Sequence, residues 1–309
     1  MAANSLYTLD DLATEVAQNY GDVSDITIAK AKKWINRALM RINEMGDWSW
    51  LMTFDATFTT VYDSGTATLI NGATTKVVTL NATQLDAAYI VTASVNGNVA
   101  VTATASLQTT TQFTLTFSPA IPVSGAYELT WSIEKESYVL GEGVKKIYSI
   151  YYQQNVRRNL KLIEDRRFRE IFTYNVTPSG TPVWYRLYGR DATTGRRKVA
   201  LFPIPASQLP IYYDYRKEMP MLVNDSDDVR VVTGMPDHMI DALIELATAI
   251  SFRQLDDSDY ESAMAEAMAR IQRLHAEDST EIDDRIRMRN FDSAEYMGDP
   301  VLPPQYGDT

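Results

Sequence analysis

The sequence predicts an α+β fold, in which a helical-bundle core carries a β region and an inserted all-β module of sandwich or barrel type. Three observations support this. Apolar residues recur at three- and four-residue spacing near both ends of the chain, as on one face of a helix. The stretch from residue 53 to 133 is instead rich in Thr and Val, with short β-prone runs between turn signals. The length, 309 residues, suits one large domain or two smaller ones.

The first segment, residues 1–61, is predicted to contain two helices. Residues 8–20 form a short helix, with Thr8 as its N-cap and Gly21 at its end. Residues 26–45 form a longer helix with an apolar face, made by Ile28, Ala31, Ile35, Leu39 and Ile42.

The second segment, residues 62–133, is predicted to be the inserted β module. It holds five β-prone runs, which are KVVTL, YIVTASV, VAVTATA, FTLTF and YELTWSI. The dipeptide Asn96-Gly97 lies between the second and third runs. Since both residues tolerate positive φ, it predicts a hairpin between those two strands.

The third segment, residues 134–277, is predicted to complete the core. Residues 144–172 are assigned to a strongly amphipathic, basic helix, and residues 173–220 to a second β region with prolines at strand ends. Residues 237–255 and 259–276 are assigned to two antiparallel helices joined by a tight break. The fourth segment, residues 278–309, contains Pro and Gly and is predicted to be an extended C-terminal arm.

The net charge of −11 argues against broad nonspecific DNA binding, which depends on Lys and Arg that neutralise phosphates. The charge is unevenly distributed. Residues 145–170 hold eight Lys or Arg against three acids, and residues 255–309 hold fourteen acids against five arginines. This polarity suits head-to-tail packing of identical subunits, and it equally suits two solvated helix faces. The candidate interface residues are Arg157, Arg158, Arg166, Arg167, Arg169, Arg285, Arg287, Arg289, Phe291 and Tyr296.

No catalytic, cofactor or metal site is predicted. The chain has no cysteine, and its two histidines, His238 and His275, belong to no metal-binding pattern. The acids at 225, 227 and 228 lack the glycine and distal glutamate of a calcium loop, so a polar turn is the better interpretation. No apolar run is long enough for a membrane helix. We therefore expect a protein that is not an enzyme and has no membrane partner.

An aromatic set in the second β region has two interpretations. Exposed, it could stack on sugars or bases; buried, it forms core and subunit interface, which strand alternation favours. Its members are Trp184, Tyr185, Tyr188, Tyr212, Tyr213 and Tyr215.

Several motifs occur in an order that resembles a known family. The helix at 26–45 has a W-x-N-R-A-like centre and is followed by Trp48 and Trp50. Further along come a G-x-P-x-x-Y-like strand entry and a strand that ends in Pro-x-Pro. The motif residues are Trp34, Asn36, Arg37, Ala38, Gly180, Pro182, Tyr185, Pro203 and Pro205. Over residues 5–60 and 140–276 the chain resembles the head-to-tail adaptor (neck or connector) proteins of tailed bacteriophages, especially the short-tailed, podovirus-like ones.

The resemblance implies a structural virion protein of the neck, made in the host bacterial cytoplasm. It implies a homo-oligomeric ring of about twelve copies, with the portal protein on one side and the tail nozzle or tail-tube protein on the other. Tail fibres are a further partner, and genomic DNA passes through the channel without specific binding. The C-terminal arm is expected to grip the portal, and the acidic C-terminal third to line or approach the channel.

Two expectations concern assembly. The apolar faces of the helices at both ends are expected to dock against neighbouring subunits in the ring. The chain alone is expected to be a monomer, because copies with a charge of −11 repel each other until the portal templates them. The alternatives are a tail fibre, spike or receptor-binding protein, a cell-wall hydrolase that acts through unmarked carboxylates, and another neck component such as a stopper.

Overall fold

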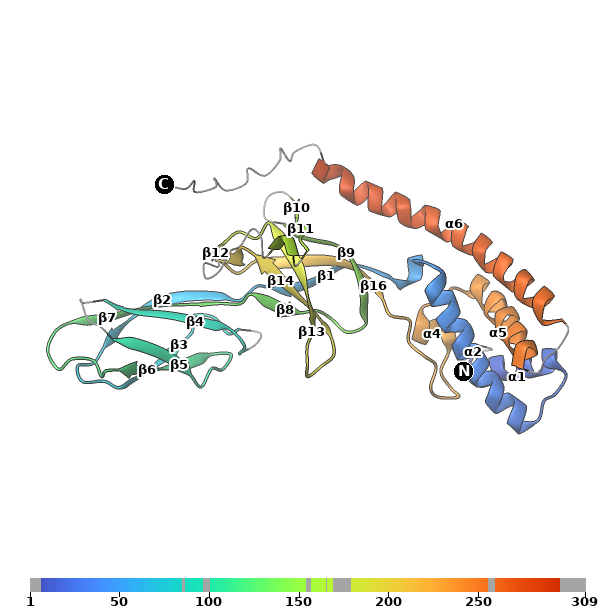
Figure 1. The fold of residues 1–309 in the computed structure, drawn as a ribbon, viewed down its shortest axis with the longest axis horizontal. Coiled ribbons are helices and arrows are strands. Elements are labelled where there is room, and N and C mark those ends of the chain that lie inside the picture. Colours follow the sequence, from blue (N-terminus) through green and yellow to red (C-terminus); the bar gives the residue numbers. More distant parts are fainter. Residues whose placement is uncertain are drawn as a thin grey trace, which may run out of the picture. The chain divides into compact units, whose positions relative to one another are not determined.

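The computed structural model divides into two compact units, each built from separate stretches of the chain. Unit 1 comprises Met1–Phe54, Gly143–Ile147 and Asp214–Thr309, and unit 2 comprises Asp55–Glu142 and Tyr148–Tyr213. The helices labelled in Figure 1 belong to unit 1, and most of the strands belong to unit 2, so the predicted α+β class is confirmed. The structure describes residues 7–84, 87–96, 101–153, 157–164, 166–168, 179–254 and 259–294.

The two N-terminal helices form where the sequence predicts them. Helix α1 (Leu9–Tyr20) begins after Thr8, whose Oγ1 accepts the Asp11 N–H at 3.2 Å. It ends at Gly21, whose φ of 90° favours glycine. Helix α2 (Asp25–Met45) begins after the N-cap Ser24 and ends at Gly46. A 3₁₀ turn, η1 (Ser49–Leu51), follows.

The C-terminal helices are α4 (Val229–Thr233), the 3₁₀ turn η2 (Asp237–Met239), α5 (Ile240–Gln254) and α6 (Tyr260–Ala294). Helices α5 and α6 pack against each other, as predicted. However, α6 does not end near residue 276. It continues to Ala294, so the first part of the predicted extended arm is helical, since no proline or glycine interrupts that stretch. Residues 295–309 lie outside the described part of the chain.

Unit 1 has one apolar core, to which helices from both ends of the chain contribute. Helix α5 packs against α1, α2 and α6, and all four bury apolar residues there. The largest fully buried side chains of this core are Trp34, Trp48, Leu12, Ile35, Leu39, Ile42 and Leu51.

The inserted β module consists of two three-stranded antiparallel sheets, which confirms it as an all-β element (Figure 1). In each sheet the central strand supplies the bulkiest buried residues, such as Trp131 in one and Phe113 in the other, whose rings meet edge to face at 5.5 Å. Gly65 and Ala93 flank Trp131 on the neighbouring strands and leave room for its ring. The sheet order β2-β7-β4 comprises Tyr62–Leu69, Tyr127–Glu134 and Ile90–Asn96, and the order β3-β6-β5 comprises Thr75–Thr79, Gln112–Ser118 and Thr102–Ser106.

The hairpin predicted at Asn96-Gly97 is wrong. Strand β4 pairs with β7, whereas β5 pairs with β6, so the connection after Asn96 joins two different sheets. The dipeptide signals a change of direction, but it does not decide whether the next strand pairs with the last one or crosses to the opposite sheet.

The basic helix predicted over residues 144–172 is also wrong. This stretch begins with strand β9 (Val144–Gln153), which is followed by β10 (Arg157–Asn159) and β11 (Lys161–Leu162). Strand β9 is rich in Val, Ile and Tyr, which fit a pleated sheet well. Three consecutive residues at its end, Ile150 to Tyr152, are at most 3% exposed, so the sheet is covered on both faces there and shows no two-residue alternation.

The second β region is confirmed from residue 179 onward; residues 173–178 lie outside the described part of the chain. Its strands are β12 (Ser179–Gly180), β13 (Trp184–Arg190), β14 (Arg197–Phe202), β15 (Ile204–Pro205) and β16 (Pro210–Lys217). These strands form three sheets together with β1 (Met52–Thr59), β8 (Ser137–Val139), β9, β10 and β11. The strand orders are β1-β16-β9-β10, β11-β13-β14-β8 and β12-β15.

Candidate assembly surfaces

The arginines predicted at the interface have different environments. Arg157 lies on β10 with its guanidinium 3.7 Å from the centre of the Tyr151 ring, and its Nε donates to Asn159 Oδ1 at 3.3 Å. It therefore contributes to packing within unit 2. Arg158, on the same strand, is exposed and remains available to a partner.

Arg166 and Arg167 lie on a short helical turn after β11, and both are exposed. The next residue, Phe168, packs edge-on against Phe202 and beneath the guanidinium of Arg186, which lies 4.3 Å from its ring centre. The turn is thereby fixed to the sheet, with its two arginines outward.

The remaining predicted interface residues cannot be assigned contacts. Arg285, Arg287, Arg289 and Phe291 belong to the distal half of α6, where only the course of the backbone is described. Arg169 and Tyr296 lie outside the described residues.

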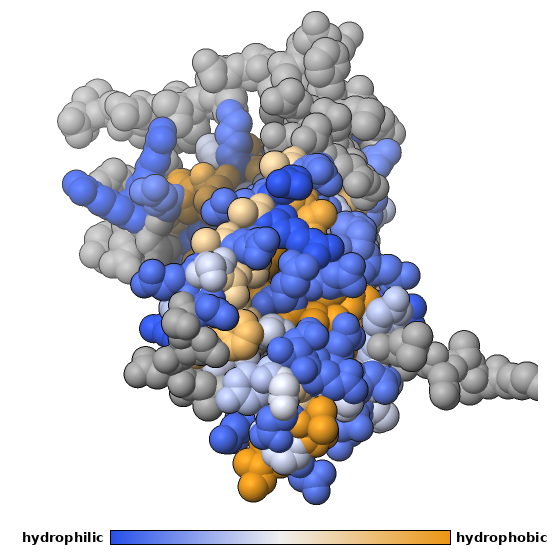
Figure 2. Space-filling model, turned by 90° about the vertical axis from the view of Figure 1, so that its right-hand side faces the viewer, coloured by the Kyte–Doolittle hydropathy of each residue, from blue (hydrophilic) through white to orange (hydrophobic). Residues whose placement is uncertain are grey.

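The expectation that the apolar helix faces dock against neighbouring subunits is not met for the faces themselves. The apolar faces of α1, α2, α5 and α6 bury one another in the core of unit 1. Figure 2 shows a view of the molecule in which the surface is mostly hydrophilic, with separate hydrophobic areas. The exposed apolar side chains of this unit are Val23, Ile26, Met40, Met221, Val223 and Val231. The groups that the surface of unit 1 offers for a contact with another molecule are therefore charged residues and scattered apolar ones.

The W-x-N-R-A-like motif on α2 is explained by the fold at three of its four residues. Trp34 and Ala38 are buried in the core. The Asn36 side chain forms two hydrogen bonds with the backbone of Leu222. Its Nδ2 donates to the carbonyl at 2.9 Å, and its Oδ1 accepts the N–H at 3.0 Å. Arg37 is exposed and has no such role.

The Trp48-x-Trp50 motif anchors α6 to the end of α2. Trp48 is fully buried and its Nε1 donates to the carbonyl of Ile42 at 2.8 Å. His275 of α6 meets its ring edge-on, with the ring centres 4.8 Å apart. One turn away, Asp278 Oδ2 accepts the Ser49 N–H at 2.6 Å.

The acids that follow Leu222 act as turn and ion-pair residues. Lys32 Nζ lies 2.7 Å from carboxylate oxygens of both Asp10 and Asp225, and these contacts raise the pKa of Lys32. Asp227 accepts the backbone N–H groups of Asn224 and Val223 at 2.8 and 2.7 Å, which lowers the pKa of its carboxyl. Asp228 caps α4. The predicted polar turn is therefore what the structure contains.

Neither histidine belongs to a metal site. His238 is exposed, and His275 packs on Trp48. Within the described ranges, no three His, Asp or Glu side chains come together to hold a metal ion.

In the aromatic set of the second β region, three rings are buried, Trp184 and Tyr212 are half-buried, and one ring is exposed. Tyr185, Tyr213 and Tyr215 are buried, and burial raises the pKa of the Tyr185 hydroxyl. Tyr188 is 46% exposed, with Arg186 and Lys198 near its ring. One exposed ring makes no extended stacking platform, so the core interpretation fits better than a sugar-binding surface.

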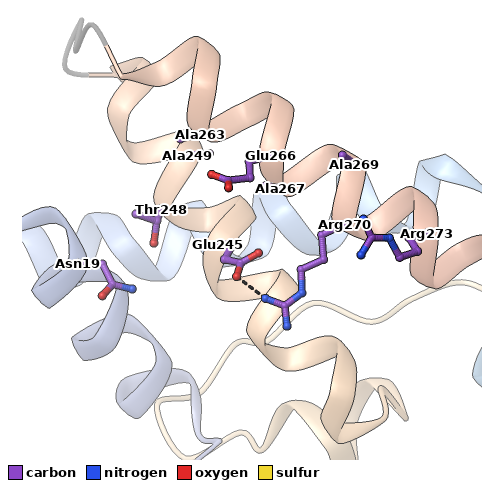
Figure 3. Close-up of a pocket in the computed structure, with 10 residues that line it drawn as sticks. All are labelled: Asn19, Glu245, Thr248, Ala249, Ala263, Glu266, Ala267, Ala269, Arg270 and Arg273. Carbon is purple, nitrogen blue, oxygen red and sulfur yellow. Dashed lines mark hydrogen bonds and ion pairs between the residues drawn. The ribbon is translucent and has the colours of Figure 1, made fainter.

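Two hollows lie on unit 1. The first, of about 550 Å³, is bordered by α1, α5 and α6, and Figure 3 shows Arg270 reaching Glu245 across it. Arg270 also lies 3.4 Å from Asp241, so its charge is compensated. The second, of about 620 Å³, lies along the outer side of α2 and is lined by Arg37, Met40, Arg41, Glu44, Ile250 and Arg253.

This second hollow is not among the surfaces predicted from the sequence. The spacing of Arg37, Met40, Arg41 and Glu44 places them on one face of α2, opposite the buried face, and would have shown a basic surface there. Arg253 comes from α5, and its proximity appears only in three dimensions.

No described helix is long and apolar enough to span a bilayer. A search of curated proteins finds no match to this sequence. The sequence model of the SU10 adaptor proteins, in contrast, matches residues 7–289, which include the helices of unit 1 and the strands of unit 2. The chain therefore belongs to the SU10 adaptor protein family, and it is a structural adaptor protein of a bacteriophage virion.

Proposed function

We propose that this adaptor forms a ring of twelve copies in the neck of the virion, between the portal protein and the tail nozzle or tail tube. Genomic DNA passes through the ring without sequence-specific contacts. The observation that carries the proposal is the family match over nearly the whole chain, together with the order of motifs described above.

The charge of the protein supports this role. A channel for DNA should not hold phosphates tightly, and a subunit with a net charge of −11 repels them. We propose that the acidic C-terminal third approaches the channel, and a ring structure with a basic bore would contradict this. The same charge keeps free copies apart, so we expect a monomer that assembles on the portal.

The parts of the chain have separate roles in this proposal. Residues 1–61 and 134–277 form the adaptor core, and residues 278–309 contact the portal. The inserted module, residues 62–133, projects from the ring and offers attachment to tail fibres. Exposed apolar side chains at its loops support a contact role, since Ile70, Leu107 and Val123 are 75%, 78% and 83% exposed.

The test is the mass of the purified chain with and without the portal of the same phage, measured by mass photometry and viewed by electron microscopy. We expect a monomer alone and a ring on the portal. A stable trimer in the absence of the portal would favour a tail fibre or spike instead. A chain that remains monomeric with the portal present would contradict the ring.

A further inference from the structure

The second hollow of unit 1 is lined mainly by positive charge. Three of its lining residues are arginines, Arg37, Arg41 and Arg253, and one is an acid, Glu44. Arg37 and Arg253 are exposed, and Arg41 is half-buried. The buried residues of α2 lie on its other side, so Arg37 and Arg41 have no part in the core, whereas Arg253 of α5 lies over the Tyr260 ring, 5.8 Å from its centre.

Arg37 and Arg41 form no ion pair with any residue that the structure describes, Glu44 included. Several other cations of the same unit are paired. The paired ones are Lys32 with Asp10 and Asp225, Lys146 and Arg216 with Asp47, Arg230 with Asp228, and Arg270 with Glu245. On α2, the unpaired charge of Arg37 and Arg41 is continued by Lys30 and Lys33, which are exposed and form no ion pair with a described residue. The basic surface of α2 therefore reaches from residue 30 to the hollow.

The lining also includes apolar groups, because Met40 is 50% exposed and Ile250 lies beside it. A phosphate backbone would use only the cations. A protein segment would use both, with carboxylates on the arginines and aliphatic groups on Met40. The hollow therefore fits an acidic protein segment better than a nucleic acid.

The same chain contains such a segment. Residues 274–284 hold five acids and no Lys or Arg. Asp278 is bound to Ser49, whereas Glu277 is exposed and forms no ion pair with a described residue. The acids at 277, 281 and 284 recur at four- and three-residue steps, and residues with this spacing share one face of a helix.

We propose that the hollow formed by Arg37, Arg41 and Arg253 receives the acidic stretch 277–284 of α6 from a second copy of this chain. The inference rests on the proposed ring, and it narrows the proposed portal contact to the part of the C-terminal segment that follows residue 284. A closed ring is built from one repeated heterologous contact, in which each copy offers one surface and receives the other. The cationic hollow and the acidic helix stretch provide these two surfaces on one subunit.

The first experiment is charge reversal with rescue, on full-length chain assembled on the portal of the same phage. We expect R37E/R41E to weaken ring formation about 10- to 100-fold, because two attractive contacts per interface become repulsive. The matched control is K145E/K217E, which makes the same charge change at two positions of unit 1 outside α2 and should assemble normally. Adding E277R/E281R to R37E/R41E should restore assembly, because each copy again meets a complementary neighbour.

The second experiment uses the absence of cysteine from the chain. A variant with R37C and E281C is assembled on the portal and treated with a short bismaleimide. We expect a ladder of covalent multimers longer than dimers, which neither single-cysteine variant can form. A product that remains monomeric would mean that residues 37 and 281 are crosslinked within one chain or are too far apart to be crosslinked. Either result would overturn the proposal.

The outcomes separate this inference from the proposed function. If the wild type fails to assemble on the portal, both the proposed ring and this contact between copies are wrong. If wild type and R37E/R41E assemble equally well, only this contact is wrong. If R37E/R41E rings form normally but retain less DNA, the hollow binds nucleic acid and not a second copy.

Discussion

The contact between Gly46 and His275 offers a sharp test of how α6 is held on unit 1. Gly46 ends α2 with a φ of 173°, an extended conformation that any residue adopts, so a side chain there costs no backbone strain. Its α-carbon faces the His275 ring. A Cβ at this position would lie 2.6 Å from Cε1 and 2.9 Å from Cδ2 of the ring. Alanine at 46 must therefore push His275 off Trp48.

The magnitude follows from two opposing effects. Overpacking of a fitted contact costs about 1–3 kcal/mol, and the lost edge-on pair with Trp48 adds about 0.5–1.5 kcal/mol. Against this, replacing Gly by Ala at an unstrained position stabilises by about 0.4–1 kcal/mol through the unfolded chain. We expect Gly46→Ala to destabilise unit 1 by about 2 kcal/mol.

The His275→Ala background reverses the sign of this effect. With the ring removed, only the favourable contribution of alanine remains, so Gly46→Ala should become neutral or stabilising by up to about 1 kcal/mol. Urea unfolding of the wild type, the two single variants and the double variant gives the coupling free energy between residues 46 and 275. Amide hydrogen exchange of α6 measures the same effect locally. An effect of Gly46→Ala that is the same in both backgrounds would refute the packing described here.

Two further perturbations test other parts of unit 1. Asn36→Leu leaves the N–H and C=O of Leu222 without their partner, so we expect a loss of about 2 kcal/mol in urea unfolding. The neighbouring Arg37→Leu, at an exposed position, should stay within about 0.5 kcal/mol of the wild type. For Asp227, the folded chain holds the pKa below its ordinary value of 3.8. The Asp227 carboxylate therefore stabilises the folded chain above pH 3.8, and this stability is lost as the pH falls through the lower pKa of the folded state. Thermal unfolding across this pH range should show that Asp227→Asn loses less stability on acidification than the wild type does.

The sequence was sufficient to predict the helices of unit 1, because each one combines periodic apolar residues with local end signals. Thr8, Ser24 and Gly21 mark the starts of α1 and α2 and the end of α1, where cap and turn chemistry depends only on neighbouring residues. These signals predict where a helix lies but not what covers its apolar face. In this chain, that face meets helices from the opposite end of the sequence.

The errors in the β regions have a common physical cause. In β9, apolar residues at 144, 147 and 150 imitate a helical period, and only a sheet covered on both faces explains why Ile150, Tyr151 and Tyr152 are all buried. In the inserted module, β4 pairs with β7, which follows β5 and β6 in the chain, so the partner of β4 is not its neighbour in sequence. Both depend on contacts far apart in sequence, which local patterns do not record.

The candidate interface shows why the number of charges along a segment does not identify a contact surface. Arg157 belongs to the most basic segment, yet its guanidinium packs on Tyr151. Arg37 belongs to α2, a shorter basic segment with five Lys or Arg against two acids, and it forms no ion pair with any described residue. A subunit that remains soluble alone should not display a large apolar face, and its net charge of −11 opposes association. In the proposed ring, local opposite charges would resolve this conflict, because they act within a Debye length of about 8 Å at physiological salt, only once a template has brought two copies together.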